Sequence, residues 1–314
     1  MNFYSGVALD RAEHLRRDEA WLNERLADPA SVFVPVWRGK NLIGPSPPPN
    51  TTPEAVGANA APRAAWLRGA DGSELVGRAA QAVFLGRDHG RAYFALDLSD
   101  MERPEHDPAL AGHGAFQDLR AVGPVIDRGE GAILAYARGL IHWHRRHRFC
   151  GVCGNPTASD AGGHVRTCAA AACASEHFPR TDPAVIMLVH DGESCVLGRQ
   201  RTWPDGMHST LAGFIEPGES LEEGVAREVF EEVGIQVGDV TYHSSQPWPF
   251  PSSLMLGFQA RARRGPLRIN RDELGAAAWY SRADLLASPE DETFRLPRRD
   301  SIARRLIEDW LRRD

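Results

Sequence analysis

The sequence predicts a mixed protein, part α+β and part α/β, with two domains and a small metal-binding unit between them. Three observations favour this class. The chain has 314 residues, more than one typical domain. Strand-like runs are interspersed with amphipathic helical patterns, and four cysteines stand in two pairs near the middle. We expect an α+β domain over residues 1–130, a linker helix with a zinc ribbon over 131–178, and a second mixed domain over 179–314.

Composition and charge narrow the class of protein. Hydrophobic residues make up 42% and charged residues 25% of the chain, as in ordinary globular proteins, and the net charge of −6 gives no general attraction to nucleic acid or anionic membranes. The first 21 residues lack an uninterrupted apolar core, and the longest apolar run, 184–189, is too short to cross a bilayer. We therefore expect a cytoplasmic protein without a membrane partner.

The N-terminal half contains recognisable elements. Residues 32–37 have a strand-like pattern, and residues 82–98 predict a hairpin that turns at Asp88, His89 and Gly90. A proline-rich stretch, 45–53, predicts a loop, and apolar residues at helical spacing over 132–147 predict an amphipathic helix. Because this half shows no catalytic constellation, we expect it to support substrate choice or dimerisation.

The paired cysteines predict a structural zinc site. They follow the pattern C-x2-C, fourteen residues, C-x4-C, and are Cys150, Cys153, Cys168 and Cys173. In a reducing compartment this spacing is typical of a zinc ribbon that uses all four thiolates and leaves no open position for catalysis. Two disulfides, or a site that has lost its metal, are the alternatives.

Three histidines and a fifth cysteine could also bind metal, but they are not expected to do so. We expect His142, His144 and His147, at the end of the linker helix, to be surface residues. The isolated Cys195 is expected to be a small buried hydrophobe.

The pattern of the C-terminal half predicts several strands and one acidic helix between them. Strand-like runs cover 183–191, 194–201, 240–250, 255–263 and 276–281, and a closing amphipathic helix covers 300–313. Between them, 220–233 predicts a helix that Ser220 and Glu223 can cap at its start and Gly234 can end. Leu221, Val225 and Val229 share the face suited to burial.

Three carboxylates of this helix lie within a narrow arc. At about 100° per residue, Glu231 lies about 60° behind Glu228 and Glu232 about 40° ahead of it. Like charges at this spacing repel, so the cluster does not stabilise the helix by itself. Binding of a divalent cation such as Mg²⁺ or Mn²⁺ explains better why three glutamates share this face. A solvated acidic helix face is the alternative.

The segment around this helix resembles the box of the Nudix hydrolases, G-x5-E-x7-R-E-U-x-E-E-x-G-U, where U is aliphatic. Every specified position matches, at Gly213, Glu219, Arg227, Glu228, Val229, Glu231, Glu232, Gly234 and Ile235. The resemblance implies an α/β/α sandwich that cleaves a nucleoside diphosphate linked to another group. It implies that the three glutamates of the arc are metal ligands and that Arg227 anchors the loop to Glu219.

A second motif, SQPWPFPSS at 245–253, follows the box. Its alternating prolines favour an extended backbone that presents Trp248 and Phe250 on one side, suited to stacking on a nucleobase or nicotinamide. From composition alone, an edge strand that packs its aromatic rings into the core is favoured.

This motif resembles the signature of the NADH pyrophosphatase branch of the Nudix family, which also carries the four-cysteine ribbon. The resemblance covers residues 149–314 strongly and the N-terminal part only in position. It implies hydrolysis of NAD(H) to NMN(H) and AMP in a homodimer and, in some members, removal of NAD caps from RNA. The substrate-binding residues it implies are Phe214, Ser245, Gln246, Trp248, Phe250, Ser253 and Phe178.

Two further positions follow from the resemblance. Glu273 matches an additional metal-binding glutamate beyond the box. Phe178 stands where several relatives have tyrosine, so ring stacking is retained there while any hydrogen bond from a hydroxyl is lost.

The expected chemistry is attack by an aligned water on a pyrophosphate whose charge is neutralised. Either Glu231 or Glu232 can take the proton, and the sequence does not choose between them. Rival hypotheses are removal of NAD caps from RNA by the same site, another Nudix substrate such as ADP-ribose, and a non-catalytic nucleotide or RNA sensor. The intact acidic trio argues against a sensor.

Overall fold

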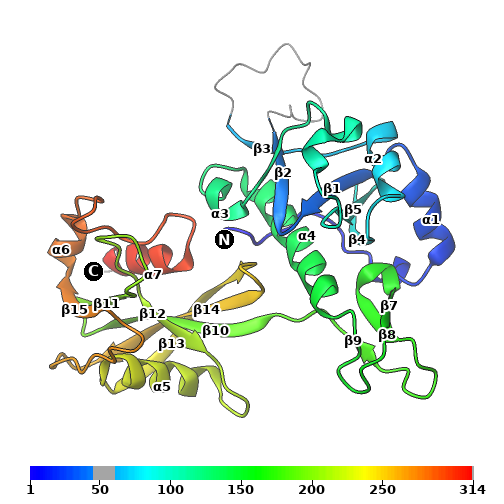
Figure 1. Cartoon of the computed structure of the whole chain (residues 1–314). Helices are drawn as coiled ribbons and strands as arrows, with labels where there is room; N and C mark the ends of the chain where they lie inside the picture. Colours follow the sequence, from blue (N-terminus) through cyan, green and yellow to red (C-terminus); the bar gives the residue numbers. More distant parts are fainter. Residues whose placement is uncertain (45–60, 313–314) are drawn as a thin grey trace. The chain divides into compact units, whose positions relative to one another are not determined.

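The computed structural model describes residues 1–44 and 61–312, and the chain forms two compact units. Unit 1 contains residues 3–180 and also 249–252, while unit 2 contains most of 181–314. Figure 1 shows the two units, each with its own sheet. The expected loop at 45–53 lies outside the described residues.

A six-stranded sheet organises the first part of unit 1. Its order is β3-β2-β1-β5-β4, with β6 pairing with β2, and β1 runs parallel to β5. The bounds are β1 Val32–Trp37, β2 Lys40–Gly44, β3 Arg63–Ala64, β4 Gln81–Asp88, β5 Arg91–Asp97 and β6 Ala115–Gln117. The predicted strand at 32–37 and the hairpin around residues 88–90 are both present.

Helices pack around this sheet. They are α1 Glu19–Ala27, α2 Gly69–Val76, α3 Leu119–Val122 and α4 Arg128–Arg146. The core between them is rich in aromatic residues, including Phe33, Phe84 and Phe94. Helix α4 is the linker helix, and it begins at Arg128 rather than 132 because the side chain of Asp127 accepts hydrogen bonds from the backbone N–H groups of Gly129 and Glu130.

The ribbon forms the end of unit 1. Its strands, β7 Thr157–Asp160, β8 Val165–Cys168 and β9 Glu176–His177, make a three-stranded antiparallel sheet. Gly162 and Gly163, with φ of 60° and 89°, turn the chain between β7 and β8, in a conformation that glycine adopts readily.

Unit 2 is a mixed sheet between helices. Its order is β13-β14-β10-β11-β15, with β12 pairing with β10, and β10 and β14 are parallel. The bounds are β10 Asp182–His190, β11 Ser194–Arg199, β12 Leu211–Phe214, β13 Val237–Trp248, β14 Ser253–Ala262 and β15 Ala276–Ser281. The helices are α5 Leu221–Val233, α6 Arg282–Leu286 and α7 Ile302–Leu311.

Alternation along β10 explains why both faces of this sheet are covered. Val185, Met187 and Val189 pack in the core that contains the apolar face of α5, whereas Ile186 and Leu188 pack in the core that contains α7. In Figure 1, α5 and α7 accordingly lie on opposite sides of the strands. This is the α/β/α sandwich that the resemblance implies.

Candidate active site and zinc site

The acidic helix forms as predicted. The Ser220 side chain accepts a hydrogen bond from the Glu223 backbone, and the Glu223 side chain accepts one from the Ser220 backbone, which closes a capping box. Gly234 ends α5 in the left-handed conformation at φ 73°. The two caps define where α5 begins and ends.

The first glycine of the box makes room for a carboxylate. Gly213 lies in β12, and a Cβ atom placed there would come within 1.8 Å of the Glu228 side-chain carboxyl carbon and within 2.1 Å of both its oxygens. Only a residue without a side chain lets this carboxyl lie against the strand. Glu228 is consequently buried at the junction of α5 and β12.

Arg227 gathers the box residues by hydrogen bonds. Its Nε and Nη2 donate to the two carboxylate oxygens of Glu219 at 2.5 and 2.9 Å, and Nη2 also donates to the Phe214 carbonyl at 2.8 Å. Its Nη1 donates to Glu228 at 2.8 Å and to Glu231 at 3.0 Å. These bonds lower the pKa of Glu219 to about 2 and raise that of Arg227, so both groups stay charged.

Glu232 is the least solvated of the three carboxylates. Burial, followed by the negative charges of Glu228 and Glu273, raises its pKa to about 8. Its Oε2 is buried and has no hydrogen-bond partner among the described residues. Burial also raises the pKa of Glu228. An anionic Glu232 is therefore unfavourable unless a cation accompanies it, which fits a divalent metal ion.

Glu273 lies in the loop before β15, and its negative charge adds to the effect of burial in raising the pKa of Glu232. The Asn270 backbone N–H donates to the Glu232 carbonyl at 2.8 Å, and its side chain donates to the Glu273 carboxylate at 2.9 Å. Asn270 was not predicted as part of the site. The available signal was its position three residues before Glu273, where asparagine often starts a turn.

The implied substrate-binding residues fall into two groups. Phe214 and Phe178 expose 60% and 62% of their surface, and Trp248, Ser245 and Ser253 are partly buried. Gln246 is fully buried, and its amide donates to the Asp300 carbonyl and accepts from the Ile302 backbone, both at 2.7 Å. The structure therefore supports Gln246 as a residue that positions α7 against β13.

The extended run in the second motif stops at Trp248. Residues 249–252 form a turn, and Phe250 is buried with its ring edge-on to Tyr4 at a centroid distance of 5.9 Å. The guanidinium groups of Arg120 and Arg138 each lie 4.7 Å from the centre of the Phe250 ring. The preference for buried aromatic packing that composition predicts thus holds for Phe250.

The four predicted zinc ligands converge. The sulfur atoms of Cys150, Cys153, Cys168 and Cys173 all lie within 4.8 Å of one another. Hydrogen bonds from Asn155 lower the pKa of Cys153 to about 6, and His177 Nε2 lies 3.2 Å from the Cys150 sulfur. Four thiols in this arrangement, none of them in a disulfide, fit tetrahedral zinc.

One expectation about the neighbouring histidines is wrong. His144 is buried rather than exposed, because it lies on the apolar face of α4 and both ring nitrogens have partners. Its Nε2 lies 2.8 Å from the Gly163 carbonyl, and its Nδ1 lies 2.9 Å from Arg166 Nη1. Cys195 is fully buried, as expected.

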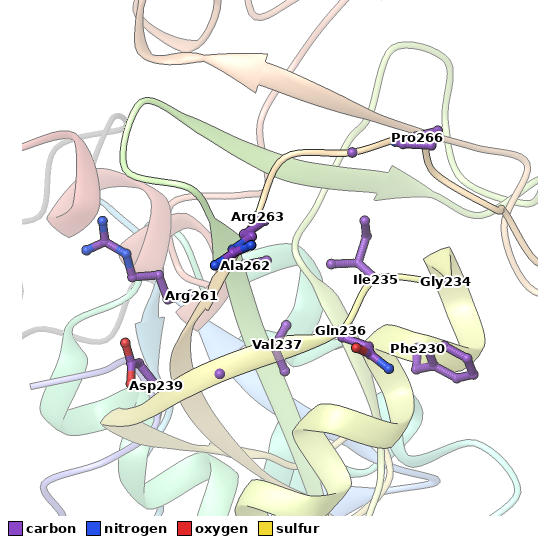
Figure 2. A pocket seen from close by; sticks show the side chains of 12 residues that line it. Phe230, Gly234, Ile235, Gln236, Val237, Asp239, Arg261, Ala262, Arg263 and Pro266 are labelled. Carbon is purple, nitrogen blue, oxygen red and sulfur yellow. The ribbon is translucent and has the colours of Figure 1, made fainter.

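A groove beside α5 is separate from the carboxylates. It has a volume of 890 Å³, and Figure 2 shows Phe230, Gln236 and Arg263 along it. Phe230 is two residues, or about 200°, from Glu228 around the helix. The groove therefore lies on another face of α5, and it contains none of the box glutamates.

Comparisons with known proteins agree with this geometry. Residues 180–304 match the NUDIX domain, residues 145–178 the NADH pyrophosphatase zinc ribbon domain, and residues 30–143 the NADH pyrophosphatase-like rudimentary NUDIX domain. The first half, for which the sequence predicted only an α+β domain, is thus itself related to the catalytic fold.

Two curated relatives extend the comparison. The chain is 33% identical to the NAD-capped RNA hydrolase NUDT12 of Homo sapiens over 351 residues, which cover 99% of this chain and 73% of that protein. It is 41% identical to the NAD-capped RNA hydrolase NudC of Mycobacterium bovis over 241 residues, 73% of this chain and 75% of that protein.

The fold and the acidic helix define a hydrolase of the Nudix class. The chain belongs to the Nudix hydrolase family, in the branch that carries the NADH pyrophosphatase zinc ribbon. No helix among the described residues is long and apolar enough to span a membrane.

Proposed function

We propose that this enzyme hydrolyses the pyrophosphate of NAD(H) to NMN(H) and AMP. The observation that carries the proposal is the buried carboxylate of Glu232, which has an unpartnered oxygen beside Glu228 and Glu273. Such a site favours a cation, and a dinucleotide pyrophosphate is the substrate class that the zinc-ribbon branch suggests.

The residues that would hold Mg²⁺ or Mn²⁺ are Glu228, Glu231, Glu232 and Glu273. Bound there, the ion would neutralise pyrophosphate charge and lower the pKa of a water ligand. The chain's own contribution is orientation: Arg227 holds Glu219, Glu228 and Glu231, and Gly213 lets Glu228 approach the strand.

Glu231 and Glu232 are the proposed general bases for the attacking water. Glu231 exposes 51% of its side chain and is restrained by Arg227, whereas Glu232 is buried. On these environments we favour Glu231 as the base and Glu232 as a ligand, since an exposed carboxylate can exchange protons with solvent.

In unit 2 the substrate rings are proposed to stack on the exposed Phe214 and on Trp248, and in unit 1 the exposed Phe178 is proposed as a stacking surface for a base. Ser245 and Ser253 would add polar contacts from β13 and β14. Gln246 and Phe250 are assigned positioning roles, because their side chains are buried against other residues.

The direct test is turnover of NADH by the purified protein with Mg²⁺ or Mn²⁺, followed by the release of AMP and NMNH. Glu232→Gln is expected to reduce kcat by at least about 10³-fold with an unchanged circular dichroism spectrum. Failure of the wild-type protein with both cations would overturn the proposal.

Removal of NAD caps from RNA is a second proposed activity of the same site. It is favoured because both relatives described above are named NAD-capped RNA hydrolases. Comparing kcat/KM for NADH and for NAD-capped RNA on one preparation ranks the two substrates. Measuring kcat/KM for ADP-ribose on the same preparation tests the rival hypothesis that the enzyme prefers another Nudix substrate.

We further propose that the protein is a cytoplasmic homodimer. In each chain the domain boundaries are proposed near residues 130 and 178, and the N-terminal domain is proposed to support dimerisation or substrate choice. Five free thiols suit a reducing compartment. Light scattering coupled to size exclusion will measure the mass, and a single-chain mass of 34.5 kDa would contradict the dimer.

A further inference from the structure

A second hollow lies in unit 1, and none of the box glutamates is among its lining residues. It has a volume of 640 Å³ and lies between the turn that follows residue 12, the tip of the ribbon and the residue after β9. Its lining residues are Glu13, His14, Arg16, Arg17, Ala161, His164, Val165 and Phe178. We call it the basic pocket.

The positive charge of the basic pocket is only partly neutralised. Arg17 has two long ion pairs, to Asp160 at 3.6 Å and to Glu176 at 3.4 Å. Arg16 makes no side-chain hydrogen bond or ion pair with any described residue, and its Nε is buried without a partner. Glu13 is the one acidic residue in the lining.

Neighbouring groups add to this positive potential. The guanidinium of Arg11 lies 4.1 Å from the centre of the Tyr136 ring. Tyr136 in turn lies beside His164, with the hydroxyl 3.4 Å from Nε2. The pKa of His164 is lowered to about 4, chiefly by burial and also by the charges of Arg16 and Arg11, so this wall of the pocket is neutral and the arginines carry the charge.

A buried donor with no partner is costly, and a guanidinium fork is suited to the oxygens of a phosphate. The exposed ring of Phe178 at the rim provides a planar surface next to this charge. A phosphate attached to a flat base satisfies both features, whereas a carboxylic acid metabolite satisfies only the first.

We propose that the basic pocket binds a nucleotide phosphate through Arg16, with Arg17 and His14 in support, and so holds the chain of a single-stranded RNA substrate. The inference rests on the proposed RNA activity and adds to it a phosphate contact outside the catalytic helix. A free mononucleotide offers the same chemistry, so the test must distinguish the two sources.

The experiment is fluorescence anisotropy with a short 5′-labelled, uncapped oligoadenylate in buffer without divalent cations, at several salt concentrations. Arg16→Gln is expected to weaken binding about tenfold at low salt and to reduce the slope of log K against log salt by about one. Arg16→Lys keeps the charge without the guanidinium fork, so its affinity for the oligoadenylate should lie between those of the wild-type protein and Arg16→Gln.

Arg103→Gln is the matched control, since Arg103 is an exposed arginine of unit 1 that is not part of the pocket. Equal affinities for wild type, Arg16→Gln and Arg103→Gln would overturn the proposal, as would equal losses in both variants. Competition by AMP that depends on Arg16 would identify a mononucleotide as a ligand, and its absence would assign the pocket to the RNA strand.

Folding of each variant is checked by its thermal unfolding curve. Because the binding assay uses neither metal nor turnover, its failure is distinguishable from failure of the proposed hydrolase, which NADH turnover measures separately.

Discussion

At the scale of single residues, the site depends on one missing side chain and one arginine. Gly213 has no Cβ, so the Glu228 carboxyl can occupy the space beside β12. Arg227 then holds that carboxyl with a hydrogen bond from Nη1 at 2.8 Å. The motif identifies these residues from their spacing in the sequence. The close approach of the Glu228 carboxyl to Gly213 depends on how α5 packs on β12.

Gly213→Ala tests this packing. The new methyl group would occupy the position of the Glu228 carboxyl, so we expect kcat to fall by about 10²-fold or more while the fold remains, because the carboxyl must shift by about 1 Å or more. Steady-state NADH turnover measures the effect. Gly238→Ala is the control, since a Cβ there has nothing within 4 Å; equal activities of the two variants would contradict the explanation.

At the scale of elements, the sequence predicted most strands and helices, because period and caps are local signals. The helix of 220–233 is the clearest case, since Ser220, Glu223 and Gly234 mark both of its ends. The burial of His144 could not be read locally, because its partners, Gly163 and Arg166, come from the ribbon. The role of Gln246 depends in the same way on the backbone of residues more than 50 positions later.

The junction of α4 with the ribbon should be sensitive to acid. His144 has both ring nitrogens bonded in the neutral form, and its pKa is lowered to about 4, chiefly by burial and also by the charges of Arg166 and His147, against the opposing effects of Gly163 and Asp97. An unfolded histidine titrates near 6.5. Its contribution to stability is therefore complete above about pH 6.5 and is lost as pH falls toward 4, by at most about 3 kcal/mol.

Urea unfolding from pH 7 to pH 4.5 measures this contribution. In His144→Gln, which can keep a donor and an acceptor but does not titrate, the loss of unfolding free energy on acidification should be smaller than in the wild-type protein. Parallel stability curves for the two proteins would show that His144 does not contribute.

Gln246 makes a second junction, between β13 and α7. Gln246→Ala would remove the buried hydrogen bonds that Gln246 donates to the Asp300 carbonyl and accepts from the Ile302 N–H, so we expect the free energy of unfolding to fall by about 2–4 kcal/mol. Ser301→Ala, which removes the α7 cap to Arg304 and the solvent-exposed hydrogen bond that the Ser301 hydroxyl donates to the Arg298 carbonyl, should cost about 1 kcal/mol. Urea titration compares them, and similar losses would argue against a positioning role for Gln246.

At the scale of the whole molecule, the two proposed metal sites lie in different units and use different ligand chemistry. The ribbon offers four sulfur atoms in unit 1, and α5 offers carboxylate oxygens in unit 2. Thiolates select zinc, whereas hard oxygen ligands suit Mg²⁺ or Mn²⁺. One metal should therefore be structural and tightly held, and the other exchangeable.

This division predicts one zinc ion per chain that survives purification, measured by atomic absorption. Cys153→Ser should lose that zinc and unfold at a lower temperature, because metal binding and folding of a ribbon are coupled. Cys195→Ala, which removes a buried thiol outside the cluster, should keep the zinc. After removal of metal by a chelator, zinc should restore the unfolding temperature and magnesium should not, since magnesium binds thiolates poorly. Recovery with magnesium alone, or a purified chain without zinc, would contradict a structural ribbon site.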